Sequence, residues 1–249
     1  MSQLTYVFAG LFLPLFPLSM VFNALFGRIR NAVLRGLMLL AWPQVGLALV
    51  FATGAEAPNW VGVWALFTSA LYGLRLLALR EVGLWTGFLA TSAWALLWIP
   101  VLAGMEAMPV HYYALGFSAP LVLLALLSAG LSRRFGAAYT GLYGGLAQTL
   151  PRFSGVLVMV VLAAIATPLF PAFFGMLATM VVASPAKAVG VAGVWLLWSW
   201  AGARLLQGLI VGPAGTDGVA DLSVASTWVY AAVLAALVVG GAYLTGDLS

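Results

Sequence analysis

The sequence predicts an all-α, polytopic membrane protein: a helical bundle of about eight transmembrane crossings, one of them broken in mid-membrane. Three observations lead to this fold class. Of the 249 residues, 64% are hydrophobic and 6% are charged, whereas a soluble domain carries about 25% charged residues. Apolar runs of about 20 residues, the length of a membrane-spanning helix, recur along the chain. No stretch alternates as the strands of a membrane barrel do, so we treat residues 1–249 as a single integral membrane domain.

The residue types that the chain lacks exclude several kinds of chemistry. There is no cysteine, there is one histidine, and the carboxylates are scattered. A thiolate metal site, an iron–sulfur centre or another metal site is therefore not expected. No Walker loop or dinucleotide fingerprint is present. We predict no cofactor, no nucleic-acid partner and no catalytic residue, and whether the chain is a subunit of a larger translocase enzyme stays open.

The charges lie mostly in the connections between the predicted crossings. These crossings are 4–26, 33–53, 60–79, 82–104, 110–131, 153–184, 188–211 and 224–245. Arginines gather in the odd-numbered connections, while Glu56 and Glu106 lie in the second and fourth. The positive-inside rule then places the odd connections in the cytoplasm of a bacterial-type inner membrane. The amino terminus is expected on the opposite side of the lipid bilayer.

The stretch TPLFPAFFGM, residues 167–176, interrupts the sixth predicted crossing. Pro168 and Pro171 break any helix that runs through it, and each half of 153–184 is too short to cross alone. We interpret this segment as one crossing made of two half-helices. Backbone exposed at membrane depth must be buried in protein or line a wet cavity. Such breaks often mark ion or substrate paths, but a proline kink held by neighbouring helices explains the local sequence equally well.

The run GLYGGLAQTLPRFSG and the break after it resemble the antiporter-like, proton-translocating membrane subunits of complex I, Mrp antiporters and membrane-bound hydrogenases. The likeness covers residues 110–213. The matching residues are Gly144, Gly145, Leu146, Pro151 and Arg152 in a cytoplasmic loop, Pro168, Phe173 and Gly175 at the family's broken helix, and Gln207, Gly212 and Pro213 at the end of the next helix. The resemblance implies the carboxy-terminal half of such a subunit. It also implies other membrane subunits as partners, and protons or monovalent cations as the transported ions.

The ionisable residues that the family uses as a relay are replaced in this chain. The position after Phe-x-Gly at the break is Met176, whose thioether has no useful basicity. Family histidines correspond to Phe117 and to a position near Trp85. The resemblance therefore implies an accessory subunit whose broken helix no longer holds a charge.

Four remaining ionisable residues are candidates for transport or subunit pairing. Intramembrane charges are costly and suggest function by default. Arg204 would pair with a carboxylate, from Glu81 or from another chain, or line an ion path. Arg75 would snorkel to the headgroups or join a pathway. His111 would lie at the outer interface or accept a proton.

Three functions stay open on the sequence alone. The first is an accessory membrane subunit of a complex I/Mrp-like proton- or cation-translocating assembly. The second is a membrane partner in an inorganic-carbon (CO2/bicarbonate) uptake complex. The third is a stand-alone small transporter, which predicts a buried charge pair within the chain. The ten tryptophans are expected mostly in an interfacial belt and as lipid-facing bulk. Small residues at 190–195 and 240–243 offer faces for close helix contact.

Overall fold

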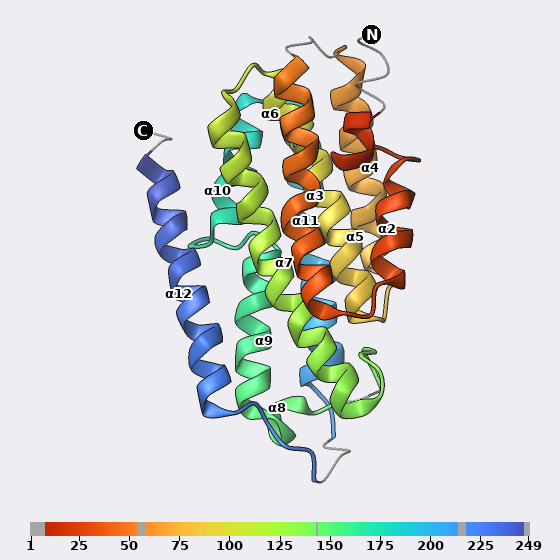
Figure 1. Cartoon of the computed structure of the whole chain (residues 1–249), viewed down its shortest axis with the longest axis vertical. Helices are drawn as coiled ribbons and strands as arrows, with labels where there is room; N and C mark the ends of the chain where they lie inside the picture. The colour runs from red at the N-terminus through yellow and green to blue at the C-terminus, as the bar shows by residue number, and fades with distance from the viewer. Residues whose placement is uncertain (1–7, 54–57, 143, 214–217, 247–249) are drawn as a thin grey trace.

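A computed structural model describes residues 8–53, 58–142, 144–213 and 218–246. Within these ranges the chain forms an elongated bundle of roughly parallel and antiparallel helices with connections at both ends (Figure 1). No strand forms there, and one isolated bridge joins Glu81 to Tyr139. The all-α prediction is confirmed.

Apart from the first predicted crossing and the short helix α8, the eleven named helices of the described ranges follow the predicted crossings closely. They are α2 (Ser19–Arg28), α3 (Ala32–Thr53), α4 (Trp60–Leu76), α5 (Val82–Leu96), α6 (Trp98–Leu102), α7 (Ala107–Phe135), α8 (Leu146–Thr149), α9 (Pro151–Ala164), α10 (Pro171–Val182), α11 (Pro185–Ile210) and α12 (Val224–Gly246). Five continuous segments are long and apolar enough to span a membrane. They are Ala32–Ala52, Val82–Leu102, Ala107–Phe135, Pro185–Ile210 and Val224–Tyr243.

Proline and glycine mark where several helices begin and end. Helices α9, α10 and α11 each start with a proline, whose fixed φ suits the first helical position and whose missing N–H is not needed there. Helix α7 ends at Gly136, which adopts φ of 79°, a left-handed conformation that glycine reaches without steric cost. These local signals explain why the helix boundaries were predictable to within a few residues.

The sixth predicted crossing consists of two half-helices, α9 and α10, as expected. The connection between them extends towards α12 (Figure 1). Ala166 and Leu169 in this connection have φ of 60° and 87°, a left-handed region that residues with a Cβ rarely adopt. The break is therefore a sharp change of backbone conformation rather than a smooth kink.

The first predicted crossing, 4–26, is wrong as a continuous helix over its described part. Residues 8–12 are helical, residues 13–18 form turns, and α2 follows. Pro14 and Pro17 cause this interruption, because proline lacks the N–H that a helix interior needs. The tetrapeptide Pro-Leu-Phe-Pro at 14–17 is repeated at 168–171. Helices α2 and α10 leave their respective breaks in opposite directions (Figure 1).

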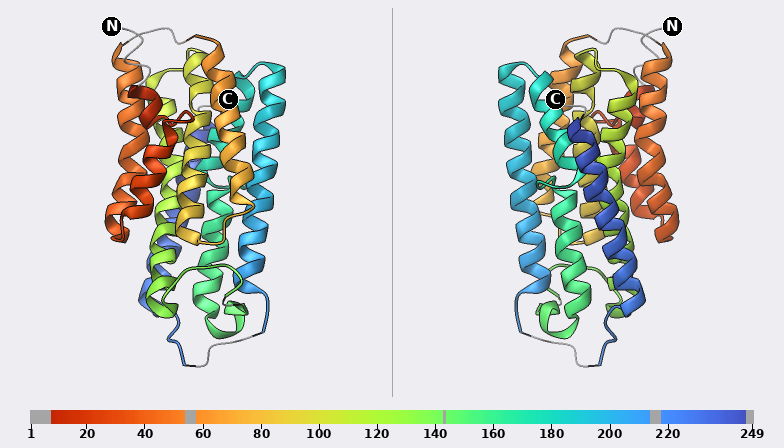
Figure 2. Two further views of the ribbon diagram at one scale, coloured as in Figure 1. Left: turned by 90° about the vertical axis from the view of Figure 1, so that its right-hand side faces the viewer. Right: turned by 90° about the vertical axis from the view of Figure 1, so that its left-hand side faces the viewer.

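Helix α5 lies in the centre of the bundle and α12 on its outside (Figure 2). Of the span that contains α5, 89% is buried inside the chain, against 11% of the span that contains α12. Trp85, Trp94, Trp98 and Trp198 are among the largest fully buried side chains. The expectation that the tryptophans lie mostly in an interfacial belt is therefore wrong for these four.

Two glycines of the small-residue stretches are used within the chain. A Cβ on Gly190 would clash with Leu66, so the glycine lets α11 approach α4 closely. A Cβ on Gly241 would lie 2.8 Å from the Leu169 carbonyl oxygen, so α12 packs directly on the second break. Gly193 and Gly240 face open space. Part of each predicted contact face therefore serves internal packing.

Candidate functional site: two helix breaks and an arginine-rich end

The second break is held by an indole from α11. Trp195 Nε1 donates to the carbonyl oxygens of Ile165 at 3.2 Å and Ala166 at 3.1 Å. The Thr167 hydroxyl donates to the Leu162 carbonyl oxygen at 3.0 Å. Both Ile165 and Ala166 are buried, where an unpaired carbonyl would be costly. Neutral donors therefore satisfy the carbonyl groups that the helix break frees.

The position where the resemblance implies a relay group is packed with apolar atoms. Met176 is fully buried. A Cβ on Gly175 would lie 3.2 Å from Tyr113 Cβ and 3.3 Å from the Phe117 ring, and one on Gly116 would lie 2.9 Å from Pro171 Cβ. Helix α10 therefore lies directly against α7, with Phe117, at a family histidine position, in the contact.

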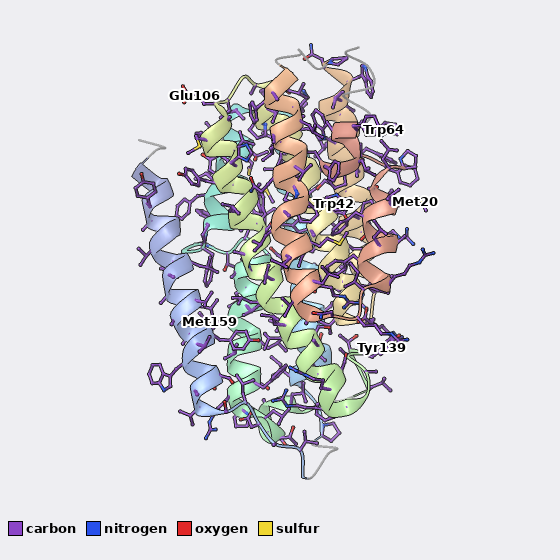
Figure 3. The ribbon with its side chains drawn as sticks, in the orientation of Figure 1. Met20, Trp42, Trp64, Glu106, Tyr139 and Met159 are labelled. Atoms are coloured by element: carbon purple, nitrogen blue, oxygen red, sulfur yellow. The ribbon has the colours of Figure 1, made fainter. Side chains whose placement is uncertain are left out.

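The first break is held by indoles from three other helices. Each indole donates from Nε1 to a backbone carbonyl oxygen: Trp42 to Leu11 at 3.1 Å, Trp98 to Leu13 at 3.0 Å, and Trp64 to Phe16 at 2.6 Å. The Phe16 N–H donates to the Thr68 hydroxyl at 3.0 Å. Figure 3 labels Trp42 and Trp64, which lie on the side of the bundle near α2. Both breaks thus depend on tryptophan donors, a role that the sequence analysis missed.

The buried polar groups of the bundle are neutral. Among the described residues, those classed as buried and polar are all serines and threonines. Several of them pair with other neutral groups: Trp198 Nε1 donates to Ser92 Oγ at 2.8 Å, and Ser92 Oγ donates to the Ser69 carbonyl oxygen at 2.7 Å. No Asp, Glu, His, Lys or Arg side chain in the described ranges is fully buried. The part of the interior that is described therefore holds no charged relay.

All nine arginines of the chain lie at or near one end of the bundle. This is the end where α2 leads into α3, α4 into α5, and α7 through α8 into α9 (Figure 1). Lys187, the one lysine, lies near the start of α11 at the opposite end. This distribution is the one from which the sequence analysis assigned the cytoplasmic side.

The loop after α7 joins two distant parts of the arginine-rich end. Val82 N–H donates to the Ala138 carbonyl oxygen at 2.9 Å, and Thr140 N–H donates to the Arg80 carbonyl oxygen at 2.8 Å. Gly141 N–H then donates to the Gly208 carbonyl oxygen of α11 at 3.0 Å. The loop is therefore fixed between the α4–α5 connection and α11.

The structure brings together the two ends of the motif that carried the resemblance. Gly144 lies against Gly212, since a Cβ on Gly144 would be 3.1 Å from the Val211 carbonyl oxygen. Gly145 has φ of 71° and precedes α8, whose first residue, Leu146, is buried. Pro151 begins α9. Glycine at 144 thus permits the loop and the end of α11 to pack backbone against backbone.

Asp221 caps α9 from far along the chain. Its carboxylate accepts hydrogen bonds from the N–H groups of Arg152 at 2.9 Å and Phe153 at 3.1 Å, two of the free donors at a helix start. Burial alone raises the pKa of Asp221. The backbone donors at Arg152, Leu222 and Phe153, together with the Arg152 charge, outweigh it and lower the pKa below its ordinary value. The sequence analysis missed this residue, because nothing near Asp221 in sequence identifies its partner.

No hydrogen bond or ion pair joins any two of the four candidate ionisable residues, all of which lie in the described ranges. Glu81 caps α5, and its carboxylate accepts from the Gly83 N–H at 2.9 Å and from the Leu84 N–H. Glu81 is not within ion-pair distance of Arg204. The Arg75 guanidinium lies 5.2 Å from the Phe88 ring centre.

His111 forms a local pair with an amide of α3. Its Nδ1 is hydrogen-bonded to Gln44 Oε1, and Gln44 Nε2 donates to the His111 carbonyl oxygen at 3.1 Å. The Phe51 ring centre lies 6.0 Å from the imidazole. This arrangement fixes the imidazole against α3, near the end of the bundle opposite most of the arginines (Figure 1).

Arg204 lines an open pocket of about 810 Å³ together with Arg80 and Trp85. The pocket lies at the arginine-rich end, between the α4–α5 connection, the loop 139–142 and α11. Arg204 is the one of the four candidates that lines this pocket, and Arg80 is a second cation in its wall.

Fold and composition together define a multi-pass helical membrane protein, and its fold matches chains of known membrane complexes. Respiratory complex I from Thermus thermophilus with bound NADH matches with a TM-score of 0.79 and 21% identity, over 94% of this chain and 52% of that chain. A chain of the Mrp complex from Dietzia sp. matches with a TM-score of 0.81 and 14% identity, over 96% of this chain and 55% of that chain. A chain of the membrane-bound sulfane sulfur reductase, an archaeal respiratory membrane complex, matches with a TM-score of 0.79 and 15% identity. The match covers 96% of this chain and 52% of that chain.

These matches confirm, as a shared fold, the resemblance that the loop and the break suggested. The shared fold covers nearly the whole chain and is not confined to residues 110–213. The chain spans about half the length of each matched chain. No family model and no curated protein matches the sequence.

Proposed function

We propose that the chain crosses the membrane about eight times, with its arginine-rich end in the cytoplasm. The five long spans, α4 and the two interrupted segments 8–28 and 151–182 would each cross once. The clustering of arginines at one end supports this orientation.

Cysteine labelling tests this topology directly, because the chain has no cysteine of its own. Single cysteines replace Ser132, near the end of α7, and Ser184, just before α11. A membrane-impermeant maleimide should label the Ser184 variant from outside the cell and the Ser132 variant only from the cytoplasmic side. A cysteine at Ser118, which is buried, is the unlabelled control. Labelling of both sites from the same side contradicts the topology.

We further propose that the chain is an accessory membrane subunit of a proton- or cation-translocating assembly. The observation that carries this proposal is the second break, where Met176 stands at the position for which the resemblance implies a charged relay, and a neutral indole holds the broken backbone. A thioether has no useful basicity and packs as flexible apolar filler. A subunit built in this way supports its neighbours rather than passing protons along its own buried groups.

The interior chemistry disfavours the stand-alone transporter. That hypothesis predicts a buried charge pair within one chain, and the described ranges contain no fully buried charged side chain. Serine and threonine hydroxyls can donate and accept hydrogen bonds, but they do not titrate near neutral pH.

Purification from native membranes in mild detergent tests the accessory role. The tagged chain should elute together with other multi-spanning subunits in fixed ratio. Elution as a separate small protein contradicts the proposal. A soluble carbonic-anhydrase-like protein as the stoichiometric partner instead indicates the inorganic-carbon function.

Replacement of Met176 by leucine tests the claim that this position carries no proton. A volume-conserving apolar exchange costs less than about 1.5 kcal/mol, so ion transport by the assembled complex should stay at the wild-type level. A large loss of transport in a fully assembled Met176→Leu complex contradicts the claim.

A further inference from the structure

The pocket at the arginine-rich end is lined by both cationic and apolar side chains. Its volume is about 810 Å³. The end of α4 and the turn that follows it, the loop 139–142 and the last third of α11 form its sides. Tyr139, labelled in Figure 3, lies on this loop.

The two cations in the wall have no side-chain partner among the residues that the structure describes. Neither the Arg80 nor the Arg204 guanidinium has a hydrogen bond or ion pair to the described residues, and none of the residues that line the pocket is acidic. A guanidinium offers five donors in a planar fork that fits phosphate oxygens. Two such groups around one opening attract an anion with several acceptor oxygens.

The same wall contains a buried donor without a partner among the described residues. Trp85 is 1% exposed and lines the pocket. Its Nε1 is buried and has no hydrogen-bond partner in the described ranges, whereas Trp94, Trp98, Trp195 and Trp198 all donate to oxygen atoms. A buried donor without a partner is uncommon and calls for an explanation such as an absent ligand or water.

The remaining wall is apolar and lies close to the end of the membrane-spanning bundle. Five leucines contribute to it: Leu76, Leu77, Leu79, Leu142 and Leu205. Cationic groups beside an apolar surface at this depth match an amphipathic ligand, whose headgroup is anionic and whose tail is hydrocarbon.

We propose that this pocket binds the phosphate group of an anionic phospholipid. Arg80 and Arg204 would donate to the phosphate oxygens, and the leucines would contact the first part of the acyl chains. Free inorganic phosphate has the same anionic oxygens but lacks the acyl chains. The proposal rests on the membrane placement given above and not on the accessory role, so the co-purification result does not bear on it.

Lipid binding to the purified, delipidated chain in neutral detergent tests this proposal. Three probes are compared: phosphatidylglycerol, phosphatidylcholine and inorganic phosphate. Native mass spectrometry counts bound lipid, and thermal unfolding followed by circular dichroism gives the apparent affinity of each probe. Phosphatidylglycerol should bind and raise the unfolding temperature, and phosphatidylcholine should have little effect.

Variants of the wall assign the binding to this pocket. Arg204→Gln and Arg80→Gln should each weaken phosphatidylglycerol binding by about tenfold or more, because each removes a charge-assisted hydrogen bond. Arg204→Lys keeps the charge but loses the fork, so its affinity should fall between wild type and Arg204→Gln. Trp85→Phe removes only the N–H and should weaken binding less. Arg28→Gln, an exposed arginine of α2 outside the pocket, is the charge-matched control.

Each outcome decides the proposal. Weaker phosphatidylglycerol binding in the pocket variants, with the control unchanged, supports it. If inorganic phosphate shows the same dependence on Arg80 and Arg204, the anion site stands and its source is soluble phosphate. Equal binding of phosphatidylglycerol and phosphatidylcholine, or pocket variants equal to the control, overturns it. Loss of a protein partner in Arg204→Gln with lipid binding intact also overturns it, because the pocket then takes a carboxylate of another subunit.

Discussion

The two helix breaks contain the same tetrapeptide, Pro-Leu-Phe-Pro, but are held in different ways. In the first, residues 11–18 including the last turn of the preceding helix, three indoles from three helices each donate to one carbonyl oxygen. In the second, residues 165–170, a single indole donates to two adjacent carbonyl oxygens. The second break alone has non-glycine residues at positive φ among those described, Ala166 and Leu169.

This difference separates what the tetrapeptide determines from what its surroundings determine. The prolines decide where a helix stops, because they remove N–H donors wherever they occur. The backbone conformation after that point depends on the donors that neighbouring helices bring. A left-handed residue with a Cβ costs about 1–2 kcal/mol, and the second break has two of them. We infer that the second break is the less stable of the two.

Replacement of Trp195 by phenylalanine should have the largest effect on this comparison. It keeps most of the ring but leaves the buried Ile165 and Ala166 carbonyl groups without their donor. Each unsatisfied group costs about 1–3 kcal/mol, so the unfolding temperature in detergent, followed by circular dichroism, should fall clearly. Trp200→Phe, an exposed residue of the same helix, is the control. Equal unfolding temperatures for both variants would show that the indole does not hold the break.

Replacement of Trp98 by phenylalanine should cost less. It removes the donor of one carbonyl group, that of Leu13, and so about 1–3 kcal/mol. The indoles of Trp42 and Trp64 continue to hold the first break. The same thermal unfolding measurement should rank Trp98→Phe between Trp195→Phe and wild type. A larger fall in unfolding temperature for Trp98→Phe than for Trp195→Phe would reverse the order of stability inferred for the two breaks.

Ala166→Gly should stabilise the second break slightly. Glycine removes about 1–2 kcal/mol of left-handed strain and adds about 0.5–1 kcal/mol of chain entropy in the unfolded state. The net gain is therefore at most about 1.5 kcal/mol, seen as a small rise in unfolding temperature. Ala163→Gly, inside α9, should instead destabilise the protein. A lower unfolding temperature in both variants would show that the backbone at Ala166 is unstrained.

The smallest effect is expected for Asp221. This residue caps the start of α9, the half-helix whose other end leads into the second break. Its folded pKa lies below the unfolded value of 3.8, so its stabilising contribution is present above pH 3.8 and is lost as the pH falls through the folded pKa. Asp221→Asn keeps the size of the side chain and one of its two acceptor oxygens, but it does not titrate. The unfolding temperature of this variant should depend less on pH in the acidic range than that of wild type. Identical acid profiles would show that the Asp221 carboxylate makes no pH-dependent contribution.

Much of the fold could be predicted from sequence because its determinants are local. Composition gives the membrane class, and the long run 153–184 with its prolines gives two half-helices. The first break escaped prediction although it carries the same tetrapeptide, because the run 4–26 has the length of one ordinary crossing. The repeat at 14–17 and 168–171 was the signal that would have revealed it.

The side-chain roles were harder to predict, because partners lie far apart along the chain. Glu81 was considered as a partner for Arg204, but it has backbone donors two and three residues away, and a helix start always offers such groups. Asp221 and Trp195 act on residues 69 and 30 positions away. No local pattern identifies such pairs, because only the folded bundle brings them together.

The indoles that hold the breaks have a consequence for the order in which the protein is made. Each indole comes later in the chain than the carbonyl group it serves: Leu13 precedes Trp98 by 85 residues, and Leu11 precedes Trp42 by 31. A nascent chain emerges from the ribosome amino terminus first. In the proposed topology, the first break would reach the bilayer with unpaired carbonyl groups, which hydrocarbon does not tolerate. We therefore expect it to remain beside the translocation machinery, or in contact with water, until α3, α4 and α6 have been synthesised. The amino-terminal helices are then released into the lipid as one group.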